Sequence, residues 1–219
     1  MAIFFDLSQP IKQGMTIFPG DPLPTIRRAV GTEAPWQVTE LHMGSHTGTH
    51  IDSASHFIPD GKTIDQYPLE RFILPGVVIS MPELSEDQPI SEDLIAKGLK
   101  SLPEGGAILI QTKWDQFWST DRYLRHPYLS SEAAYRLVRA RASLVGIDAL
   151  NVDSTVQSTD HVHRILLGKD ILIVENLTAL TMLKHGSLYQ FSFLPIRLPG
   201  LDGSPVRAVA WETQSNLLL

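Results

Sequence analysis

The chain has 219 residues, of which 43% are hydrophobic and 19% charged, as is usual for a soluble globular protein with a sizeable core. Its formal net charge is −6 and no stretch is densely basic, which argues against nucleic-acid and anionic-membrane partners. Cysteine is absent, so disulfides, thiolate metal sites and cysteine nucleophiles are excluded. Any metal ion must therefore be bound by nitrogen and oxygen.

The N-terminal sequence MAIFFDLSQP is apolar only briefly, because Asp6 interrupts the run and no basic segment precedes it. We expect it to be neither a signal peptide nor a membrane span. A cytoplasmic location is the default expectation.

Alternating and continuous apolar runs predict short strands with helices dispersed among them. In chain order, strands are expected at 3–7, within an extended segment 38–52, and at 107–112, 144–150, 171–175, 189–198 and 205–212. Turns are expected at 18–22 (FPGDP) and 200–205. Helices are expected at 91–100, 130–142 and 158–168, with Ser91, Ser130 or Ser131, and Ser158 as N-caps and Gly168 as the stop. We predict an α/β fold with a mixed sheet, which could be partly closed as a barrel.

The most informative segment is HTGTHIDSASHF, in which four metal-ligand side chains fall within eleven residues: His46, His50, Asp52 and His56. Imidazoles and carboxylates are natural ligands of zinc, manganese and iron. Glycine and threonine disfavour a helix here, and in an extended chain all four even positions would share one face. A straight strand would nevertheless separate His46 from His56 by about 33 Å. Either the chain bends, for which Gly48 offers a place, or the residues serve more than one metal centre.

A complete site needs ligands from elsewhere in the chain. Glu175 ends the apolar run ILIVE, where a carboxylate is costly unless it is paired, metal-bound or in water beyond the sheet edge. His161 and His163 would point in different directions on a helix, so we expect only one of them to be a ligand. The HExxH motif of zincins and the GxSxG elbow of serine hydrolases are both absent.

The segment HTGTHIDSASHF resembles the signature HxGTHxDxPxHF of the cyclase family. That family includes bacterial kynurenine formamidases (arylformamidases), isatin hydrolases and many uncharacterised metal-dependent hydrolases. FDLSQPI with FPGDP, and then GIDALNVDS, HRILLGKDILIVENL and LDGSPVRAVA, resemble further family blocks in the same order. The resemblance covers nearly the whole chain. It implies one cyclase-like domain over residues 1–219 with a swivelling β/β/α fold, in a homodimer or a higher homo-oligomer.

The resemblance also implies a binuclear site with two divalent metal ions, of which zinc is the leading choice and manganese the other. The implied metal ligands are His46, His50, Asp52, His163 and Glu175. Asp52 would bridge the two ions, and His56 would be the catalytic acid and base. The residues alone leave open that His56 is another ligand. They also leave open whether Asp148 and Asp153 orient a ligating histidine or serve as caps and turns.

Two positions depart from the family signature. Ala54 stands where proline is usual, which loosens the loop and leaves the chemistry intact. Phe18 stands where kynurenine formamidases have a tryptophan that contacts the substrate. Phe18 keeps an aromatic substrate-binding wall but lacks the indole N–H donor, so the change bears on the choice of substrate.

The expected function is hydrolysis of an amide C–N bond in a small aromatic substrate. N-formylkynurenine is the leading candidate, and a related N-acyl or cyclic amide such as isatin comes next. Metal ions would activate water and polarise the carbonyl, while His56 moves the proton. One alternative is a metal-dependent lyase or cyclase, which product analysis would separate. Another is a non-enzymatic small-molecule-binding protein, which predicts no turnover.

Overall fold

The structure, a computed structural model, describes residues 3–29 and 36–212. Its strands are β1 (Phe4–Asp6), β2 (Thr25–Arg28), β3 (Thr39–His42), β4 (His50–Asp52), β5 (Ile73–Ser80), β6 (Pro89–Ile90), β7 (Ala107–Gln111), β8 (Tyr128–Leu129), β9 (Leu144–Ile147), β10 (Leu172–Glu175), β11 (Leu188–Ser192), β12 (Gly203–Pro205) and β13 (Val209–Glu212). Its α-helices are α1 (Glu92–Ala96), α2 (Ser131–Arg139) and α3 (His161–Leu167). Short 3-10 segments lie at Ala54–His56, Ile64–Gln66, Leu69–Arg71, Leu99–Ser101, Trp114–Phe117, Asp121–Arg125 and Leu180–Met182.

Nine strands form one mixed sheet in the order β1-β13-β11-β5-β7-β9-β10-β4-β12. The central strands β5, β7, β9 and β10 are parallel to one another. Their sequences are nearly continuous apolar runs, as strands covered on both faces require. The predicted α/β fold with a mixed sheet is confirmed. Among the described residues the strand order has two ends, β1 and β12, so the sheet is curled but not a closed barrel.

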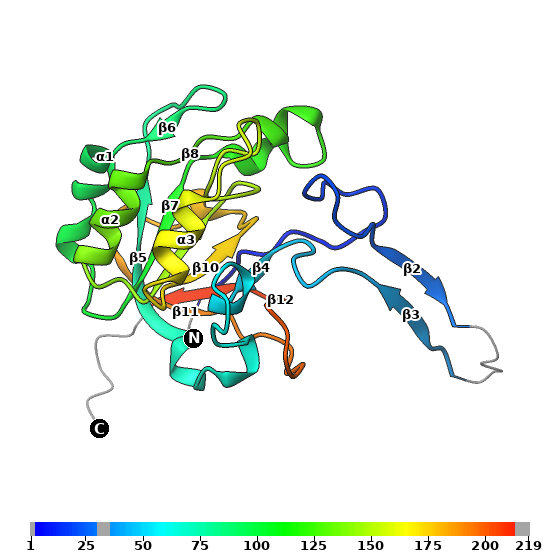
Figure 1. Ribbon diagram of the computed structural model, residues 1–219. Helices are drawn as coiled ribbons and strands as arrows, with labels where there is room; N and C mark the ends of the chain where they lie inside the picture. Colours follow the sequence, from blue (N-terminus) through cyan, green and yellow to red (C-terminus); the bar gives the residue numbers. More distant parts are fainter. Residues whose placement is uncertain (1–2, 30–35, 213–219) are drawn as a thin grey trace.

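Two hydrophobic clusters cover the two faces of this sheet. Ile79 and Ile110 point to the face on which α1, α2 and α3 pack (Figure 1). Their neighbours Val78 and Leu109 point to the opposite face and pack against aromatic residues such as Phe191. The alternation follows from the two-residue period of a strand. The sheet is therefore a rigid base for whatever its strand ends carry.

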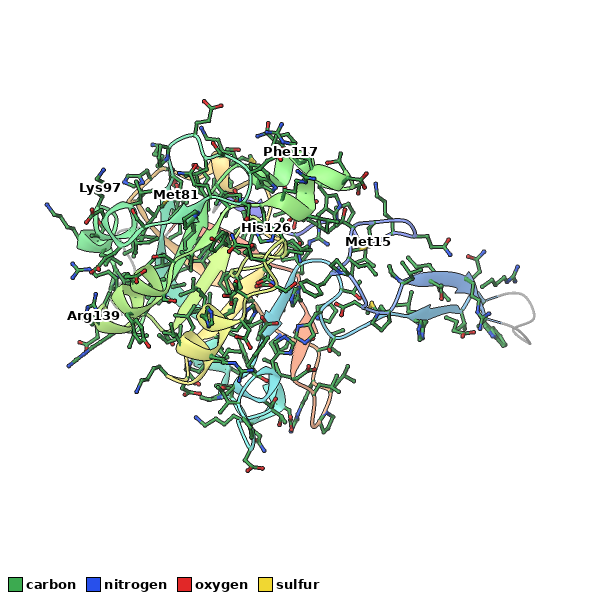
Figure 2. The ribbon with its side chains drawn as sticks, turned by 45° about the horizontal axis from the view of Figure 1, so that its top comes forward. Met15, Met81, Lys97, Phe117, His126 and Arg139 are labelled. Atoms are coloured by element: carbon green, nitrogen blue, oxygen red, sulfur yellow. The ribbon has the colours of Figure 1, made fainter. Side chains whose placement is uncertain are left out.

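A two-stranded hairpin, β2–β3, stands away from this body (Figures 1 and 2). All eight of its strand residues are exposed. A second small sheet pairs β6 with β8 in parallel. Among the described residues, no helix combines the length and the apolar character needed to cross a lipid bilayer.

The expectation of an extended segment over 38–52 is only partly right. Strand β3 ends at His42 and β4 begins at His50, and the chain turns between them. Gly48 has a φ of +69°, a left-handed value that suits glycine. The bend that the sequence offered at Gly48 is therefore present.

Several predicted elements end earlier or begin later than expected, among them two helices and the strand β9. Helix α1 stops at Ala96, and the Ser91 side chain makes no capping hydrogen bond. Helix α3 begins at His161, because Ser158 has a φ of +53° that is incompatible with a helix. Strand β9 stops at Ile147 instead of 150. Ser130 does cap α2, accepting from the backbone N–H of Ala133 at 3.2 Å.

Strand β5 was not among the expected elements, because Pro75 and Gly76 interrupt the run ILPGVVIS and both are disfavoured in strands. Pro75 is tolerated at a position paired with Gln190 of β11. Gly76 is required by a close approach, because a Cβ there would overlap the carbonyl oxygen of Ala107 on β7.

We expect Gly76→Ala to lower the free energy of unfolding by about 1–3 kcal/mol, because β5 and β7 must separate to admit the methyl group. Urea denaturation would measure the change. Gly44→Ala is the matched control, since its new Cβ would find its nearest neighbour at an ordinary 3.4 Å. Equal stabilities of the two variants would contradict the prediction.

Candidate metal centre

Strand pairing in the sheet brings two of the predicted ligands, His50 and Glu175, together. His50 and Asp52 lie on the same face of β4, while Ile51 between them points into the core. Strand β4 pairs with β10 so that Glu175 lies directly opposite His50. The carboxylate that ends the apolar run of β10 is therefore buried beside an imidazole and does not reach solvent.

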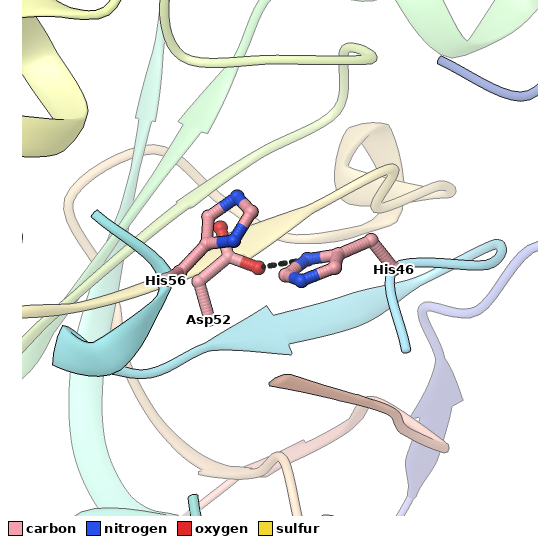
Figure 3. Close-up of side chains that lie close together, drawn as sticks. All are labelled: His46, Asp52 and His56. Carbon is pink, nitrogen blue, oxygen red and sulfur yellow. Dashed lines mark hydrogen bonds and ion pairs between the residues drawn. The ribbon is translucent and has the colours of Figure 1, made fainter. Parts of the chain in front are cut away.

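Bends at both ends of β4 bring His46 and His56 to the same place. The turn at Gly48 carries His46 back over the strand, and the 3-10 turn Ala54–His56 carries His56 over its other end. The centroids of the two imidazole rings are 4.0 Å apart. Figure 3 shows both rings beside the Asp52 carboxylate. The two histidines thus serve one site.

The Asp52 carboxylate lies at the centre of this cluster and is fully buried. Its Oδ1 accepts a hydrogen bond from His46 Nδ1 at 2.7 Å and lies 3.3 Å from His50 Nε2. Its Oδ2 is buried without a hydrogen-bond partner. His163 Nε2 lies 3.6 Å from this oxygen. An orphaned carboxylate oxygen is costly unless a cation lies beside it.

His50 and His163 are oriented in the same way. His50 donates from Nδ1 to the carbonyl oxygen of Gly48 at 2.9 Å, and His163 donates from Nδ1 to Asp153 at 2.8 Å. Each ring therefore presents Nε2, the nitrogen without a proton in the neutral form, to Asp52 and Glu175. Fixing the second nitrogen in this way is how proteins prepare a histidine to bind a metal.

Asp153 performs both roles that the sequence left open. Besides binding the His163 ring, its carboxylate accepts the backbone N–H groups of Val162 and His163 at the start of α3. Asp148 instead accepts the backbone N–H groups of Thr112 and Lys113, which is a turn role.

Among the described residues, two groups of side chains have the spacing to hold a divalent ion. One is His46, Asp52 and His56, and the other is His50, Asp52 and Glu175; within each, the ligand atoms lie within 4.8 Å of one another. Both groups contain Asp52, in the position of a bridge. His163 belongs to neither group, although its Nε2 is 3.4 Å from Glu175 Oε1. The nitrogen and oxygen donors and the orphaned Asp52 Oδ2 fit a divalent ion. His56 lies where either a ligand or an acid/base would lie.

Asp202 also belongs to the cluster, although the sequence around it predicts only a turn. The Asp202 carboxylate accepts hydrogen bonds from Ser45 Oγ at 2.9 Å, His46 Nε2 at 3.0 Å and His56 Nδ1 at 3.2 Å. The only signal was an acidic residue in the block LDGSP, 146 positions from His56 in the chain. Strand β12 brings it close by pairing with β4.

The carboxylates set the protonation of this cluster. The hydrogen bonds from His46 and His56 hold the pKa of Asp202 well below its usual range. Burial lowers the pKa of His46, but Asp52 and Asp202 outweigh it and raise the pKa to about 10. For His163, burial is again outweighed, here by Asp153, Asp52 and Glu175, and its pKa lies well above the ordinary value. Burial would raise the pKa of Asp52, yet the imidazoles of His50 and His46 hold it well below the ordinary value of an aspartate.

A cavity of about 200 Å³ opens onto the cluster. His46, His50, His56, His163 and Glu175 line its polar side, and Phe18, Phe57 and Leu150 contribute aromatic and apolar surface. Phe18 is where an aromatic substrate-binding residue was expected. His161 lies outside this cavity with its side chain 69% exposed, so His163 is the member of the pair that joins the site.

Comparison with known proteins places these features in a family. The sequence profile of the Cyclase family, described as "Putative cyclase", matches residues 5–154. The kynurenine formamidase of Bordetella avium (strain 197N) is 30% identical over 217 residues, covering 97% of this chain and 99% of that protein. The kynurenine formamidase of Paracidovorax citrulli (strain AAC00-1) is 29% identical over 221 residues, covering 94% and 95%.

Solved structures share the fold. Isatin hydrolase A from Labrenzia aggregata superposes with a TM-score of 0.84 at 22% identity, covering 97% of this chain and 94% of that one. A potential metal-dependent hydrolase with cyclase activity superposes with a TM-score of 0.81 at 25% identity, covering 98% and 100%. The profile match over more than half of the chain, the full-length relatives and the shared fold show that this protein belongs to the Cyclase family.

Proposed function

We propose that the protein is a metal-dependent hydrolase that cleaves the amide C–N bond of a small aromatic substrate. The observation that carries the proposal is the buried Asp52 carboxylate, with one oxygen unpartnered, at the centre of an imidazole cluster beside an aromatic cavity. The kynurenine formamidases related to this protein support an N-formyl aryl amine, such as N-formylkynurenine, as the leading substrate. A cyclic aryl amide such as isatin is second, because likeness to the isatin hydrolases rests on the fold.

The proposal includes two divalent ions, with zinc as the leading choice and manganese as the other. Two groups of ligand atoms that share Asp52 support this number, and all donors are nitrogen or oxygen. We assign His46, His50, Asp52, His163 and Glu175 as ligands. When bound there, such ions would lower the pKa of water and polarise the substrate carbonyl.

His56 is proposed as the acid and base. Its Nδ1–H donates to Asp202, which leaves Nε2 free to take a proton from the attacking water and return it to the leaving nitrogen. The Asp202 carboxylate would stabilise the imidazolium formed in between. The rings of Phe57 and His46, whose centroids are 4.7 Å and 4.0 Å from that of His56, would hold the His56 ring in place.

The activity test uses the purified full chain, with metal content measured by plasma mass spectrometry and then reloaded with zinc or manganese. We expect about two equivalents per chain, and release of formate from N-formylkynurenine or ring opening of isatin. Water must be incorporated into the product, so a product formed without ¹⁸O from labelled water would favour a lyase. Binding without turnover by the metal-loaded chain would favour a non-enzymatic role.

Two substitutions separate metal binding from proton transfer. Asp52→Asn should lower metal content and activity together, because the shared carboxylate loses its charge. His56→Ala should keep both metal equivalents and lower kcat by about 100-fold or more, as expected for loss of a general acid and base. His161→Ala is the matched control and should change neither. If His56→Ala loses one equivalent of metal, His56 is a ligand and the role assigned to it is wrong.

Metal binding should also release protons. Without metal, the raised pKa values of His46, about 10, and of His163 keep both rings protonated at pH 7. A ligating imidazole must be neutral, so the apparent affinity should rise with pH between 6 and 8, by about tenfold per pH unit for each proton released. Calorimetric titrations in two buffers of different ionisation enthalpy would count the protons. Identical heats in both buffers would contradict the prediction.

We also propose that the protein assembles as a homodimer, or a higher homo-oligomer, through the β2–β3 hairpin. An isolated two-stranded hairpin is marginally stable in water. This one nevertheless exposes Ile26 and Leu41, which are paired across its two strands, together with Val38 and Trp36. A second copy of the chain would cover both faces and bury these side chains.

Light scattering after size exclusion would test the assembly. The double variant Ile26→Asp/Leu41→Asp should lower the measured mass to that of a 24.3 kDa monomer, whereas Leu69→Asp, an exposed leucine on the body of the protein, should not. A monomeric wild type, or an oligomer unaffected by the double variant, would refute the hairpin proposal.

Two expectations from the sequence stay predictions. One is a single domain over residues 1–219, a range that extends past the described residues, and the other is a cytoplasmic location.

A further inference from the structure

One acidic residue of the cavity has no part in the cluster described above. Asp21 lines the cavity together with Thr16, Ile17 and Phe18, all from the loop before β2. It belongs to the motif FPGDP, whose residues predict a turn.

The turn fixes the position of Asp21 relative to the aromatic wall. The backbone N–H of Asp21 donates to the carbonyl oxygen of Phe18 at 3.1 Å, and Gly20 between them has a φ of +103°. A turn of this kind brings its first and fourth residues close together, and glycine at the third position permits it. Phe18 and Asp21 therefore border the cavity as a pair, one offering a ring face and the other a negative charge.

The Asp21 carboxylate is not committed to the fold. Among the residues that the structure describes, no hydrogen bond or ion pair involves its side-chain oxygens, in contrast to Asp52, Asp153 and Asp202. The side chain is half-buried, so its charge is only partly screened by water. A ligand that occupies the cavity would displace some of that water and strengthen any interaction with the carboxylate.

Apart from the histidines assigned to the metal ions and to proton transfer, the chain gives the cavity no cation that would attract an anionic substituent. Among its lining residues there is no lysine and no arginine, whereas Asp21 and Glu175 are both acidic. A protonated amine on the substrate would meet Asp21 as a counter-ion. A carboxylate on the substrate would meet a like charge there, which costs free energy.

We infer that Asp21 determines specificity by favouring aryl amides that carry a protonated amine beside the ring, over neutral ones and over those whose only charge is a carboxylate. The inference rests on the proposed amide hydrolysis for its catalytic meaning, and it adds the substrate class that the metal cluster alone does not select. Phe18 would hold the ring and Asp21 the amine, while the scissile bond reaches the histidine cluster.

The test uses three N-formyl anilines with the same ring and scissile bond. They differ only in the ortho ketone side chain, which ends in a primary amine, a methyl group or a carboxylate. With the zinc-loaded full chain, we expect kcat/KM to be at least about tenfold higher for the amine than for the methyl compound, the size of one partly desolvated ion pair. The carboxylate compound should be the poorest of the three.

Asp21→Asn preserves shape and removes the charge. It should reduce the amine preference to less than about threefold while leaving kcat/KM for the methyl compound within about twofold of wild type. Asp93→Asn, on an exposed position of α1, changes the net charge by the same amount and should preserve the full preference. A loss that merely reflected damage to the fold would affect all three substrates alike.

A binding measurement keeps the inference separate from the proposed chemistry. Calorimetry with the deformylated amine and methyl ketones should show about tenfold tighter binding of the amine by wild type and equal binding by Asp21→Asn. Turnover of all three substrates without an amine preference would overturn the inference and leave the hydrolase proposal standing. Amine-selective binding without turnover of any substrate would support the inference and overturn the hydrolase proposal.

Discussion

The arrangement of this protein centres on one carboxylate that is removed from water and only half hydrogen-bonded. Asp52 is fully buried, and four imidazoles and Glu175 crowd around it. Burying such a charge is strongly unfavourable unless cations or hydrogen-bond donors surround it. Its neighbours provide part of this positive charge. The pKa values of His46 and His163 are raised far enough that both rings are protonated when no metal ion is bound. The cluster is thus preorganised for positive charge, and a divalent ion can take the place of the protons.

The fold supplies this environment with very little regular structure. Strand β4 has three residues, yet it lies between β10 and β12, so its neighbours fix both the register and the direction of its side chains. His46 and His56 are brought to the strand by a left-handed glycine at one end of β4 and a 3-10 turn at the other. The short strand fixes the positions of His50 and Asp52, and the bends at its ends bring the side chains of an eleven-residue segment into one cluster. A longer straight strand would hold the same residues too far apart for one site.

The sequence was informative where chemistry is local and much less so where the fold brings distant segments together. His46, His50, Asp52 and His56 were recognisable because they are close in the chain, and Gly48 was identifiable as a place where the chain could bend, with more than one metal centre as the alternative. Glu175 was identifiable from the cost of a carboxylate at the end of an apolar strand. Only the resemblance to a family distinguished His163 from His161. Which of the two side chains faces the site depends on where α3 begins, and the sequence did not predict that residue.

Other features had no local signal. Strand β5 contains proline and glycine that argue against a strand, and only the close approach of Ala107 explains the glycine. The start of α3 depends on Asp153, which lies eight residues before the helix and binds its N-terminal N–H groups. Asp202 was overlooked because its partners lie at the other end of the chain. In each case the determining contact is tertiary, so propensity and periodicity could not reveal it.

Asp202 and Asp52 bind opposite nitrogens of one ring, His46, and this links the two proposed tasks of the site. The Asp52 side chain is 1% exposed and the Asp202 side chain 39% exposed. A charge that must hold a cation in place acts most strongly where water cannot screen it, whereas a charge that stabilises a transient imidazolium must allow protons to exchange with solvent. The buried carboxylate suits the first task and the half-exposed one suits the second. Because His46 contacts both, and Asp202 also holds His56, a change in the turn that carries Asp202 would alter metal ligation and proton transfer together.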